Sequence, residues 1–259
     1  MGKYEMSLGL QSFTFYRAYK THETLIEAAK KCGFTAIEMY GKHLALDTCD
    51  DPAAVVKQYE DAGLKISGFG VHGFSTDEAA ARRIFDFAKV AGIKAISTSC
   101  GDRQAAPDVF KMLERLGDEY DINCALHNHG RKQWHGYVWA MEDVIASTSP
   151  RIGLCLDTAW LIDVQADCVG TFEKLRARVY GVHIKDFVFD RAGKKQDVVV
   201  GTGNLDLDAF VKALVDADFG GYVTLEFGTS EPDPVPSTIQ CVQNIKASLE
   251  KAGATLAGA

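Results

Sequence analysis

The sequence lacks two features that would point to whole classes of protein. No apolar run approaches the roughly 18 residues of a membrane span, so we expect no membrane partner. Basic residues are in deficit, with 28 Lys and Arg against 35 Asp and Glu and a net charge of -7. Because nonspecific nucleic-acid binding depends on basic side chains that neutralise phosphates, this balance argues against a nucleic-acid partner.

The spacing of the cysteines and the scarcity of proline are also informative. The seven cysteines are scattered, odd in number and never in a Cys-x-x-Cys spacing. This argues against a disulfide framework and a thiolate zinc site, and a reducing cytoplasm is the expected location. Only 6 prolines occur, and no proline- or serine-rich linker divides the chain. We therefore predict a single domain over residues 1–259.

Short apolar runs alternate with longer segments of helical periodicity along the whole chain. Eight such pairs in 259 residues predict an α/β protein, a single (β/α)8 TIM barrel. A doubly wound open sheet is the alternative, but the glycine-rich turn that usually follows its first strand is missing. The predicted strands are Ser7–Phe13, Ala36–Tyr40, Lys65–His72, Ala95–Cys100, Asn123–His129, Ile152–Thr158, Val179–Lys185 and Tyr222–Gly228.

Helix ends are marked as well. Gly33, Gly63 and Gly92 each follow a helical pattern and precede a strand, as C-terminal caps do. Ser75, with Glu78 three residues later, has the pattern of a capping box, which predicts a helix that begins directly after Ser75.

Five of the predicted strands end in charged or ligand-forming side chains. The active site of a TIM barrel lies at the carboxyl ends of its strands, and charged residues are seldom buried in strands unless they are paired or bind metal. Alternation along the strands places these side chains on inward faces. A mixed set of nitrogen and oxygen donors there suits Mn, Zn, Co or Fe(II). The residues are Glu38, His127, His129, Asp157, His183, Lys185 and Glu226.

Each of these residues alone also has a structural interpretation. A single histidine at a strand end can be an ordinary hydrogen-bonded interior residue. Asp157 can cap a helix, and Glu226 can form an ion pair with Lys185 or Arg178. The segment 201–204 follows the seventh strand, where barrels often bind phosphate, but a surface turn is the better interpretation. The occurrence of such residues together, at one end of the barrel, favours a site.

In their order and spacing, these segments resemble the xylose isomerase-like TIM barrels, which include sugar (phosphate) isomerases and epimerases, inosose dehydratase and endonuclease IV. The resemblance covers nearly the whole chain. It implies one divalent metal ion, with Mn, Zn or Co most suitable, held by His127, Asp157, His183 and Glu226. The segments that carry it are 8–12, 33–38, 125–130, 156–158, 181–186 and 221–226.

The shared chemistry of that family implies proton removal next to a carbonyl, through an enediolate. We therefore expect a metal-dependent sugar isomerase or epimerase, with a small carbohydrate as its partner and a possible homo-oligomer. A dehydratase or lyase on a keto-sugar or inosose is the alternative. It is kept because His127 stands where epimerases have glutamate, and Trp160 where many relatives have histidine.

Four residues are the candidates for catalysis: Glu38, His129, Lys185 and Glu226. His129 shares a strand face with His127 and lies nearer the mouth, so its imidazole can exchange a proton with substrate. Lys185 can stabilise an enediolate and Glu38 can act as a base, while an ion pair between the two is the structural alternative. The candidate substrate-binding residues are His43, His72 and Trp160.

Overall fold

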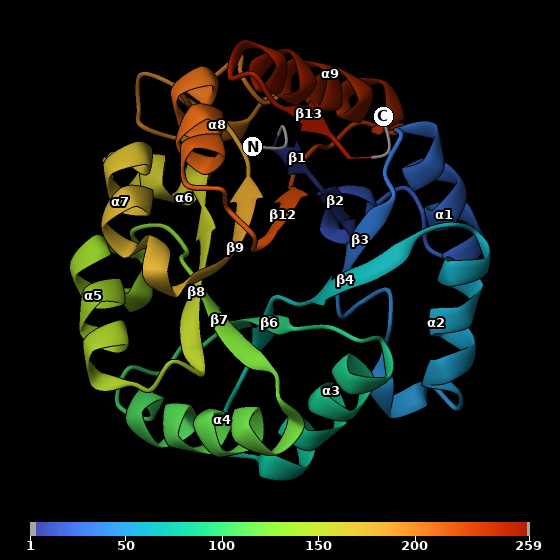
Figure 1. Ribbon diagram of the computed structural model, residues 1–259, viewed down its shortest axis with the longest axis vertical. Helices are drawn as coiled ribbons and strands as arrows, with labels where there is room; N and C mark the ends of the chain where they lie inside the picture. The colour runs from blue at the N-terminus through green and yellow to red at the C-terminus, as the bar shows by residue number, and fades with distance from the viewer. Residues whose placement is uncertain (1–3, 258–259) are drawn as a thin grey trace.

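The computed structural model describes residues 4–257, and its centre is a ring of parallel strands enclosed by helices (Figure 1). Paired strands follow one another in the order β4-β3-β2-β12-β9-β8-β7-β6-β5, so the predicted TIM barrel is confirmed. All eight predicted strands are present within one to three residues of their expected ends. The ring consists of β2 (Leu8–Gln11), β3 (Ala36–Met39), β4 (Lys65–Phe69), β5 (His72–Gly73), β6 (Ala95–Ser99), β7 (Asn123–His127), β8 (Ile152–Asp157), β9 (Val179–Ile184) and β12 (Tyr222–Leu225).

The third predicted strand is split in two. Its first part, β4, pairs with β3, and its second part, β5, pairs with β6. The ring therefore passes from β3 to β6 through two pieces of one predicted strand, with residues 70 and 71 between them.

Helices cover the outside of the ring (Figure 1). Strand residues such as Leu156, Val182 and Leu225 alternate with the inward-facing polar ones and are buried in the hydrophobic core. Burial of each such side chain contributes about 1.5–3 kcal/mol to stability. The α-helices are α1 (His22–Lys31), α2 (Pro52–Asp61), α3 (Glu78–Val90), α4 (Ala106–Tyr120), α5 (Val138–Ser147), α6 (Thr158–Asp163), α7 (Cys168–Leu175), α8 (Leu207–Asp216) and α9 (Val235–Lys251); short 3-10 helices span Ser12–Phe15, Leu46–Thr48, Trp134–Gly136 and Arg176–Arg178.

The predicted helix ends are confirmed in one case and wrong in the other. The three capping glycines have φ angles of 83, 78 and 67°, the left-handed region that glycine adopts without strain. The capping box at Ser75 is wrong, because α3 begins at Glu78 and its N-cap is Asp77. The Asp77 carboxylate accepts from Ala80 N at 3.0 Å. A cap at Asp77 also places Glu78 in the first turn, where the helix dipole favours a negative charge.

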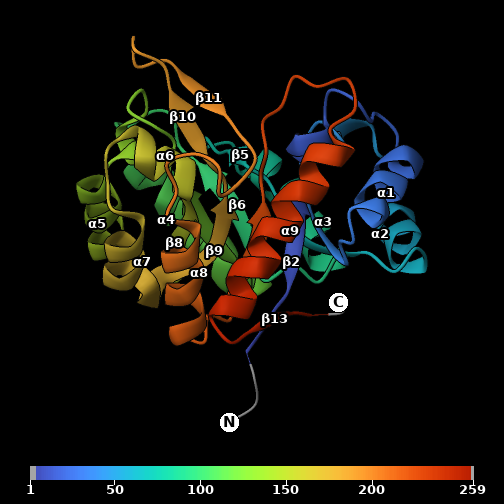
Figure 2. The same ribbon diagram turned by 90° about the horizontal axis from the view of Figure 1, so that it is seen from above.

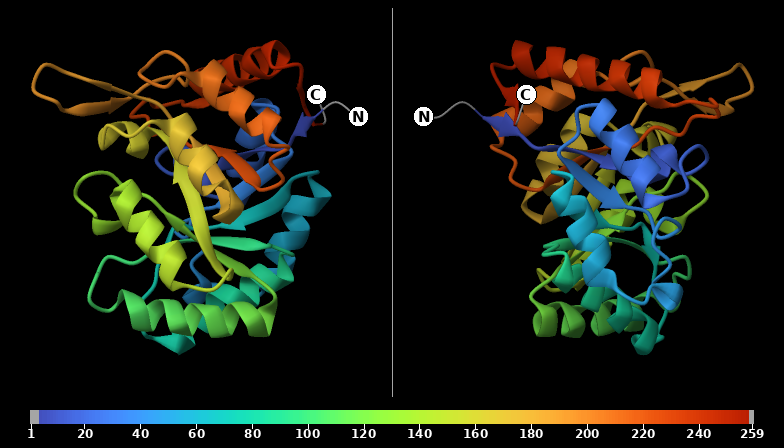
Figure 3. Two further views of the ribbon diagram at one scale, coloured as in Figure 1. Left: turned by 60° about the vertical axis from the view of Figure 1, so that its left-hand side comes forward. Right: turned by 90° about the vertical axis from the view of Figure 1, so that its right-hand side faces the viewer.

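The two ends of the barrel are built differently (Figures 2 and 3). At one end, near both termini, β1 (Glu5–Met6) pairs with β13 (Thr255–Leu256). At the other end a hairpin of β10 (Phe187–Phe189) and β11 (Lys195–Asp197) projects beyond the ring. Because this hairpin follows β9 directly, it stands at the carboxyl ends of the barrel strands, where the predicted site residues lie.

The cysteines form no disulfide: all seven are free thiols, and six of them are buried. Within residues 4–257, no helix is both long enough and apolar enough to cross a lipid bilayer.

Candidate metal and active site

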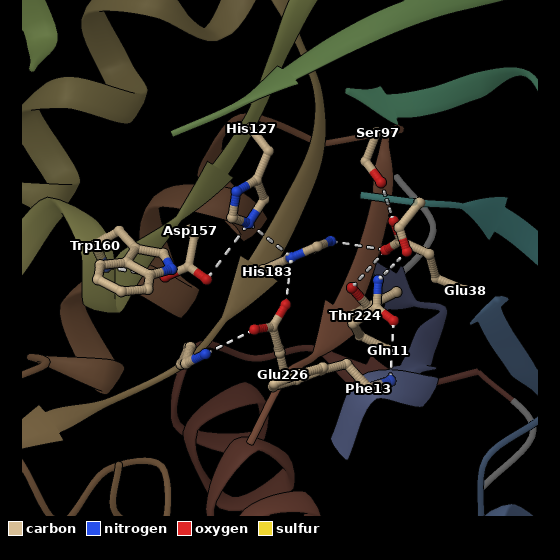
Figure 4. Close-up of polar contacts among 12 residues, drawn as sticks. Gln11, Phe13, Glu38, Ser97, His127, Asp157, Trp160, His183, Thr224 and Glu226 are labelled. Atoms are coloured by element: carbon tan, nitrogen blue, oxygen red, sulfur yellow. Dashed lines mark hydrogen bonds and ion pairs between the residues drawn. The ribbon is translucent and has the colours of Figure 1, made fainter. Parts of the chain in front are cut away.

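Four strands that are neighbours in the ring bring the predicted ligands together. His127 and Asp157 are the last residues of β7 and β8, His183 is in β9, and Glu226 follows β12. One donor atom from each lies within 4.8 Å of all the others (Figure 4). Strand register produces this closeness, since Asp157 stands directly opposite His183 in the β8–β9 ladder.

Donor atoms in this cluster have the spacing that a metal site requires. His127 Nε2 lies 3.1 Å from His183 Nδ1 and 3.5 Å from Asp157 Oδ2. Glu226 Oε2 lies 3.0 Å from the same His183 Nδ1. Ligands bound to one ion at about 2.0–2.2 Å are separated by roughly 3–3.5 Å. Two imidazole nitrogens and two carboxylate oxygens are also a donor set that suits Zn, Mn or Co.

Asp157 meets both of the interpretations that the sequence left open. Its Oδ1 caps α6 by accepting from Trp160 N at 3.0 Å. Its Oδ2 is buried and has no hydrogen-bond partner within the described residues. A buried carboxylate oxygen without a donor is costly unless a ligand satisfies it, and this oxygen faces the other three candidate ligands. The four residues therefore fit a divalent cation.

Asn128 fixes the carboxyl ends of β7 and β8 relative to each other. Its amide nitrogen donates to Asp157 O at 3.0 Å, and its amide oxygen accepts from Asp157 N at 2.8 Å. This closed pair of hydrogen bonds continues the ladder beyond the last residues of the two strands. It holds His127 and Asp157 side by side.

Burial and neighbouring charges set the protonation of the cluster. Burial, helped by His183, lowers the pKa of His127 to about 3. Burial raises the pKa of Asp157 to about 6, against the pull of Lys185. Burial also opposes ionisation of Glu226, but Lys185 and His183 outweigh it and hold the pKa of Glu226 well below its ordinary value. At neutral pH, His127 is thus neutral and both carboxylates are ionised, as metal binding requires.

His183 is the exception in this cluster. Burial opposes its protonation, but Cys155 and Glu38 raise the pKa of His183 well above its ordinary value. Its Nε2 donates to Glu38 Oε2 at 2.7 Å, which leaves Nδ1 facing the cluster. A metal ion that binds at Nδ1 therefore displaces a proton.

Glu38 lies on the side of His183 that faces away from the other candidate ligands (Figure 4). It is not among the residues that line the cavity. Besides His183, its carboxylate accepts from Ser97 Oγ and from Thr224 Oγ1, the latter at 3.2 Å. A bulge in the β3–β4 ladder sets Glu38 opposite Gly68, and a Cβ atom at Gly68 would lie only 2.9 Å from Glu38 Cγ. The backbone is thus shaped to hold this buried carboxylate under His183.

Lys185 is the buried cation of the site. Its Nζ lies 2.6 Å from Glu226 Oε1 and 3.5 Å from Asp197 Oδ1, a residue of β11. The ion pair between Glu226 and Lys185 is therefore present, but it uses only one oxygen of Glu226 and leaves the other for the cluster. Lys185 and Glu38 form no ion pair with each other in the described part of the chain.

A cavity of about 280 Å³ opens onto the cluster at the carboxyl end of the barrel. His129 and Trp160 form one side of it, with ring centroids 5.7 Å apart, and Lys185 and Glu226 reach it from β9 and β12. The remaining lining residues are Gln11, Phe13, Tyr40, Val71, Ser99 and His127.

The two other predicted histidines do not reach this cavity. Both nitrogens of His43 are engaged, Nδ1 with Ser12 Oγ at 2.9 Å and Nε2 with Tyr19 O at 3.0 Å. His72 packs against Phe69, with ring centroids 4.1 Å apart, and does not line the cavity. Of the three predicted substrate-binding residues, the structure brings only Trp160 to the cavity.

The glycine-rich segment 201–204 is a turn built around a side chain of the protein itself. Backbone N–H groups of Gly201, Gly203 and Leu205 donate to the Asp186 carboxylate at 2.8–3.0 Å. The amide groups that would hold a phosphate are thus satisfied internally, in agreement with the predicted turn.

Comparison with known proteins agrees with this geometry. The sequence matches the xylose isomerase-like TIM barrel family over residues 26–247. The chain belongs to this family. No curated protein matches it significantly.

Several solved structures share the fold at low identity. The 3-keto-D-glucoside 4-epimerase of E. coli superposes with a TM-score of 0.76 at 18% identity, over 94% of this chain and 100% of that chain. The IolI protein, solved with a bound zinc atom, gives 0.75 at 17%, over 95% and 98% of the two chains. The probable 3-DHS dehydratase AsbF of Bacillus anthracis gives 0.74 at 17%, over 92% and 99%.

Three contributors to this xylose isomerase-like site were not predicted from the sequence. Gln11 ends β2 and lines the cavity, and the rule that found the other strand-end residues applies to it as well. Ser97 is a small polar residue inside a strand and carries no comparable signal. Asp197 lies on the hairpin, 12 residues beyond Lys185, and only the fold brings the two together.

Proposed function

We propose that this protein is a divalent-metal-dependent enzyme that removes a proton next to the carbonyl of a sugar, as an isomerase or epimerase. The observation that carries the proposal is the buried four-donor cluster with an unsatisfied Asp157 oxygen, at the end of a cavity that a small carbohydrate can enter. The family and the free thiols are consistent with a cytoplasmic enzyme of carbohydrate metabolism.

In this proposal His127, Asp157, His183 and Glu226 hold the metal ion. Bound there, the ion would polarise the carbonyl and lower the energy of an enediolate. Glu38 acts through His183: it orients the imidazole so that Nδ1 faces the ion. We prefer this positioning role for Glu38 over that of the base, because its carboxylate is fully buried and engaged by three donors.

His129 is the proposed proton-handling residue. Burial, with the neighbouring His127 and His135, lowers its pKa to about 3 and keeps the imidazole neutral. Negative charge that develops on a bound substrate raises the pKa of a nearby imidazole, so a proton taken by His129 is stabilised as the reaction proceeds. Lys185, which Glu226 and Asp197 hold in place, supplies a fixed ammonium group toward a substrate hydroxyl.

A dehydratase or lyase on a keto-sugar or inosose is the second candidate. Glu226 is the one carboxylate on the cavity wall among the described residues, and Lys185 already binds one of its oxygens. An epimerase that inverts a carbon with two carboxylates needs one on each face of the substrate. The described lining of this cavity supplies only one. A single imidazole opposite an ammonium group suits removal of a proton and loss of a neighbouring hydroxyl.

One experiment separates these candidates. Metal-loaded protein is incubated in D2O with ketoses, inososes and 3-keto-glycosides, and the carbon-bound deuterium is followed by NMR. Exchange with the carbon skeleton and all substituents retained supports an isomerase or epimerase, whereas loss of water or of an aglycone supports a lyase. Absence of exchange and elimination across the panel, in protein with a full metal complement, contradicts the proposal.

The role of His129 has its own test. We expect His129→Ala to bind metal like the parent and to lose about 100- to 10,000-fold in turnover, the usual contribution of a positioned acid or base. Elemental analysis and turnover are measured on the same sample. If the variant also loses its metal, His129 belongs among the ligands.

A further inference from the structure

A second cavity of about 450 Å³ adjoins the first one across two shared residues, His129 and Trp160. One side of it is the loop after β7, residues 130–133, and the other is the tip of the β10–β11 hairpin, residues 193–195. Trp160 also borders a third cavity, of about 380 Å³, on the opposite side of the hairpin. The Trp160 indole therefore stands between the candidate metal ligands and the second cavity, which we call the outer chamber.

This outer chamber is lined by four cations and one carboxylate. The carboxylate, Asp163, is buried and already satisfied, since its Oδ2 accepts from Arg131 N at 2.9 Å and its Oδ1 lies 3.4 Å from the Arg131 guanidinium. The ammonium groups of the other three cations form no ion pair with a carboxylate within residues 4–257. In a chain with a net charge of -7, this concentration of positive charge is a local departure. The four cations are Arg131, Lys132, Lys194 and Lys195.

Lys195 is the best-positioned of the four. Its Nζ lies 3.3 Å from the centroid of the Trp160 ring, a cation–π contact that fixes the ammonium group at the boundary with the first cavity. Its backbone is held by pairing with Phe189 in the hairpin. Asp197, on the same strand, is bound to Gly228 N at 2.9 Å and to Lys185. Lys195 thus stands on an anchored element and not on a free loop.

The electrostatics at Lys195 favour an anion. Burial, together with the positive charges of Lys185 and Lys132, lowers the pKa of Lys195 although Asp163 and Asp197 oppose the shift. A group with negative charge in the chamber compensates for the desolvation of this ammonium group and gains charge-assisted hydrogen bonds from several donors at once. A neutral sugar substituent gains neither.

We propose that the outer chamber binds an anionic substituent, a carboxylate or a phosphate ester, so that the substrate is a keto-sugar acid or a keto-sugar phosphate. This inference rests on the proposed function, because it places the reacting carbonyl at the metal ligands. The charged group then lies beyond Trp160, next to Lys195 and within reach of Lys132. The substrate spans the two cavities with its neutral part against the indole edge.

Binding to the metal-free protein tests the chamber without requiring activity. The probes are D-fructose, D-fructuronate and D-fructose 6-phosphate, which share one ketose skeleton and carry no charge, a carboxylate and a phosphate at the same carbon. We expect at least one charged probe to bind about tenfold more tightly than fructose by calorimetry, with a preference that falls as salt screens it. The tighter of the two charged probes identifies the anion.

Variants then show which residue causes the preference for a charged probe. Lys195→Gln should remove about tenfold of the charge preference, measured as the ratio of the dissociation constants of fructose and the charged probe, while Lys195→Arg should restore most of it. Lys111→Gln is the matched control, because Lys111 is an exposed cation on α4, 3.9 Å from Asp108 and outside the chamber. Equal affinity for all three probes, no measurable binding of either charged probe at millimolar concentration, or a preference that survives in Lys195→Gln overturns the inference.

Failure of this inference is distinguishable from failure of the proposed function. If neutral ketoses exchange deuterium in the metal-loaded protein and no charge preference exists, the reaction stands and the chamber is wrong. If no sugar exchanges, but the metal-free protein prefers a charged probe through Lys195, the chamber stands and the proposed reaction is wrong.

Discussion

Two buried aspartates at the carboxyl ends of the neighbouring strands β8 and β9 look alike in the sequence and differ in their surroundings. Asp157 is the last residue of β8 and Asp186 lies two residues beyond β9, and both are at most 1% exposed. Asp186 accepts three backbone N–H groups on its two oxygens. Asp157 accepts one, and its second oxygen has no partner in the described part of the chain.

This difference separates a structural carboxylate from a binding one. A buried ionised group that is fully hydrogen-bonded within the protein needs nothing more, whereas one with an unsatisfied oxygen costs free energy until something binds it. The Asp186 carboxylate holds the segment 201–205 in its turn through these hydrogen bonds. Asp157 instead keeps one oxygen directed at three other donors. The comparison predicts opposite effects for the same substitution at the two positions.

The largest effect is expected at Asp157. Asp157→Asn retains a side-chain oxygen that can cap α6 but loses the anionic oxygen that faces His127, so we expect loss of metal binding with little change in stability. Asp157→Ala should lose the cap as well, at a further cost of about 1 kcal/mol. Elemental analysis after loading with Zn or Mn and thermal unfolding measure the two effects separately. Metal content equal to that of the parent in Asp157→Asn would remove Asp157 from the ligand set.

How much of this could be predicted from the sequence follows from the same contrast. Alternation and strand ends identified the barrel and placed His127, Asp157, His183 and Glu226 among seven candidate residues at one end of it, because strand register brings such positions together. The family resemblance, and not periodicity, selected these four as the ligands. Periodicity cannot show which oxygen of a carboxylate is free, which is why Asp157 kept two interpretations. It also missed the β10–β11 hairpin, whose strands have three residues each and too few positions for a pattern to emerge.

Glu38 sharpens the comparison, because it is satisfied like Asp186 but its donor is a candidate metal ligand. We expect Glu38→Gln to weaken metal affinity about 10- to 100-fold, since a carboxylate that orients a ligating imidazole contributes that much. Competition titrations with a chromophoric chelator measure it, and the absorption spectrum of the Co-loaded protein reports the altered geometry.

Ser97→Ala is the matched control for this variant, because Ser97 donates a hydrogen bond to Glu38 and, in the described part of the chain, forms none with the four candidate ligands. It should change metal affinity less than Glu38→Gln does. If Glu38→Gln binds metal like the parent and loses at least about 100-fold in turnover, Glu38 is the catalytic base and not a positioning residue.

At Asp186 we expect a loss of stability without a loss of metal. Asp186→Asn places an NH2 group against backbone N–H donors, so unfolding should become easier by about 1–3 kcal/mol, the cost of leaving buried groups unpaired. Chemical denaturation of the metal-free protein measures the change. A variant that unfolds like the parent and has lost its metal would show that Asp186, and not only Asp157, serves the site.

The last expected effect, which is absent at neutral pH, extends the comparison to histidines and to pH. His43 is hydrogen-bonded through both nitrogens, whereas His72 has a buried Nε2 without a partner in the described part of the chain. Burial lowers the pKa of His72 to about 4. Above pH 6.5 His72 is neutral in the folded and the unfolded chain and contributes nothing to the pH dependence. Between pH 6.5 and 4 only the unfolded chain takes up the proton, so this group destabilises the fold by up to roughly 2–3 kcal/mol as the pH falls.

His72→Leu should flatten the loss of stability over that interval, measured by denaturation at several pH values in the metal-free protein. An unchanged pH dependence would mean that His72 is protonated as readily in the folded chain as in the unfolded one, and that water reaches its Nε2.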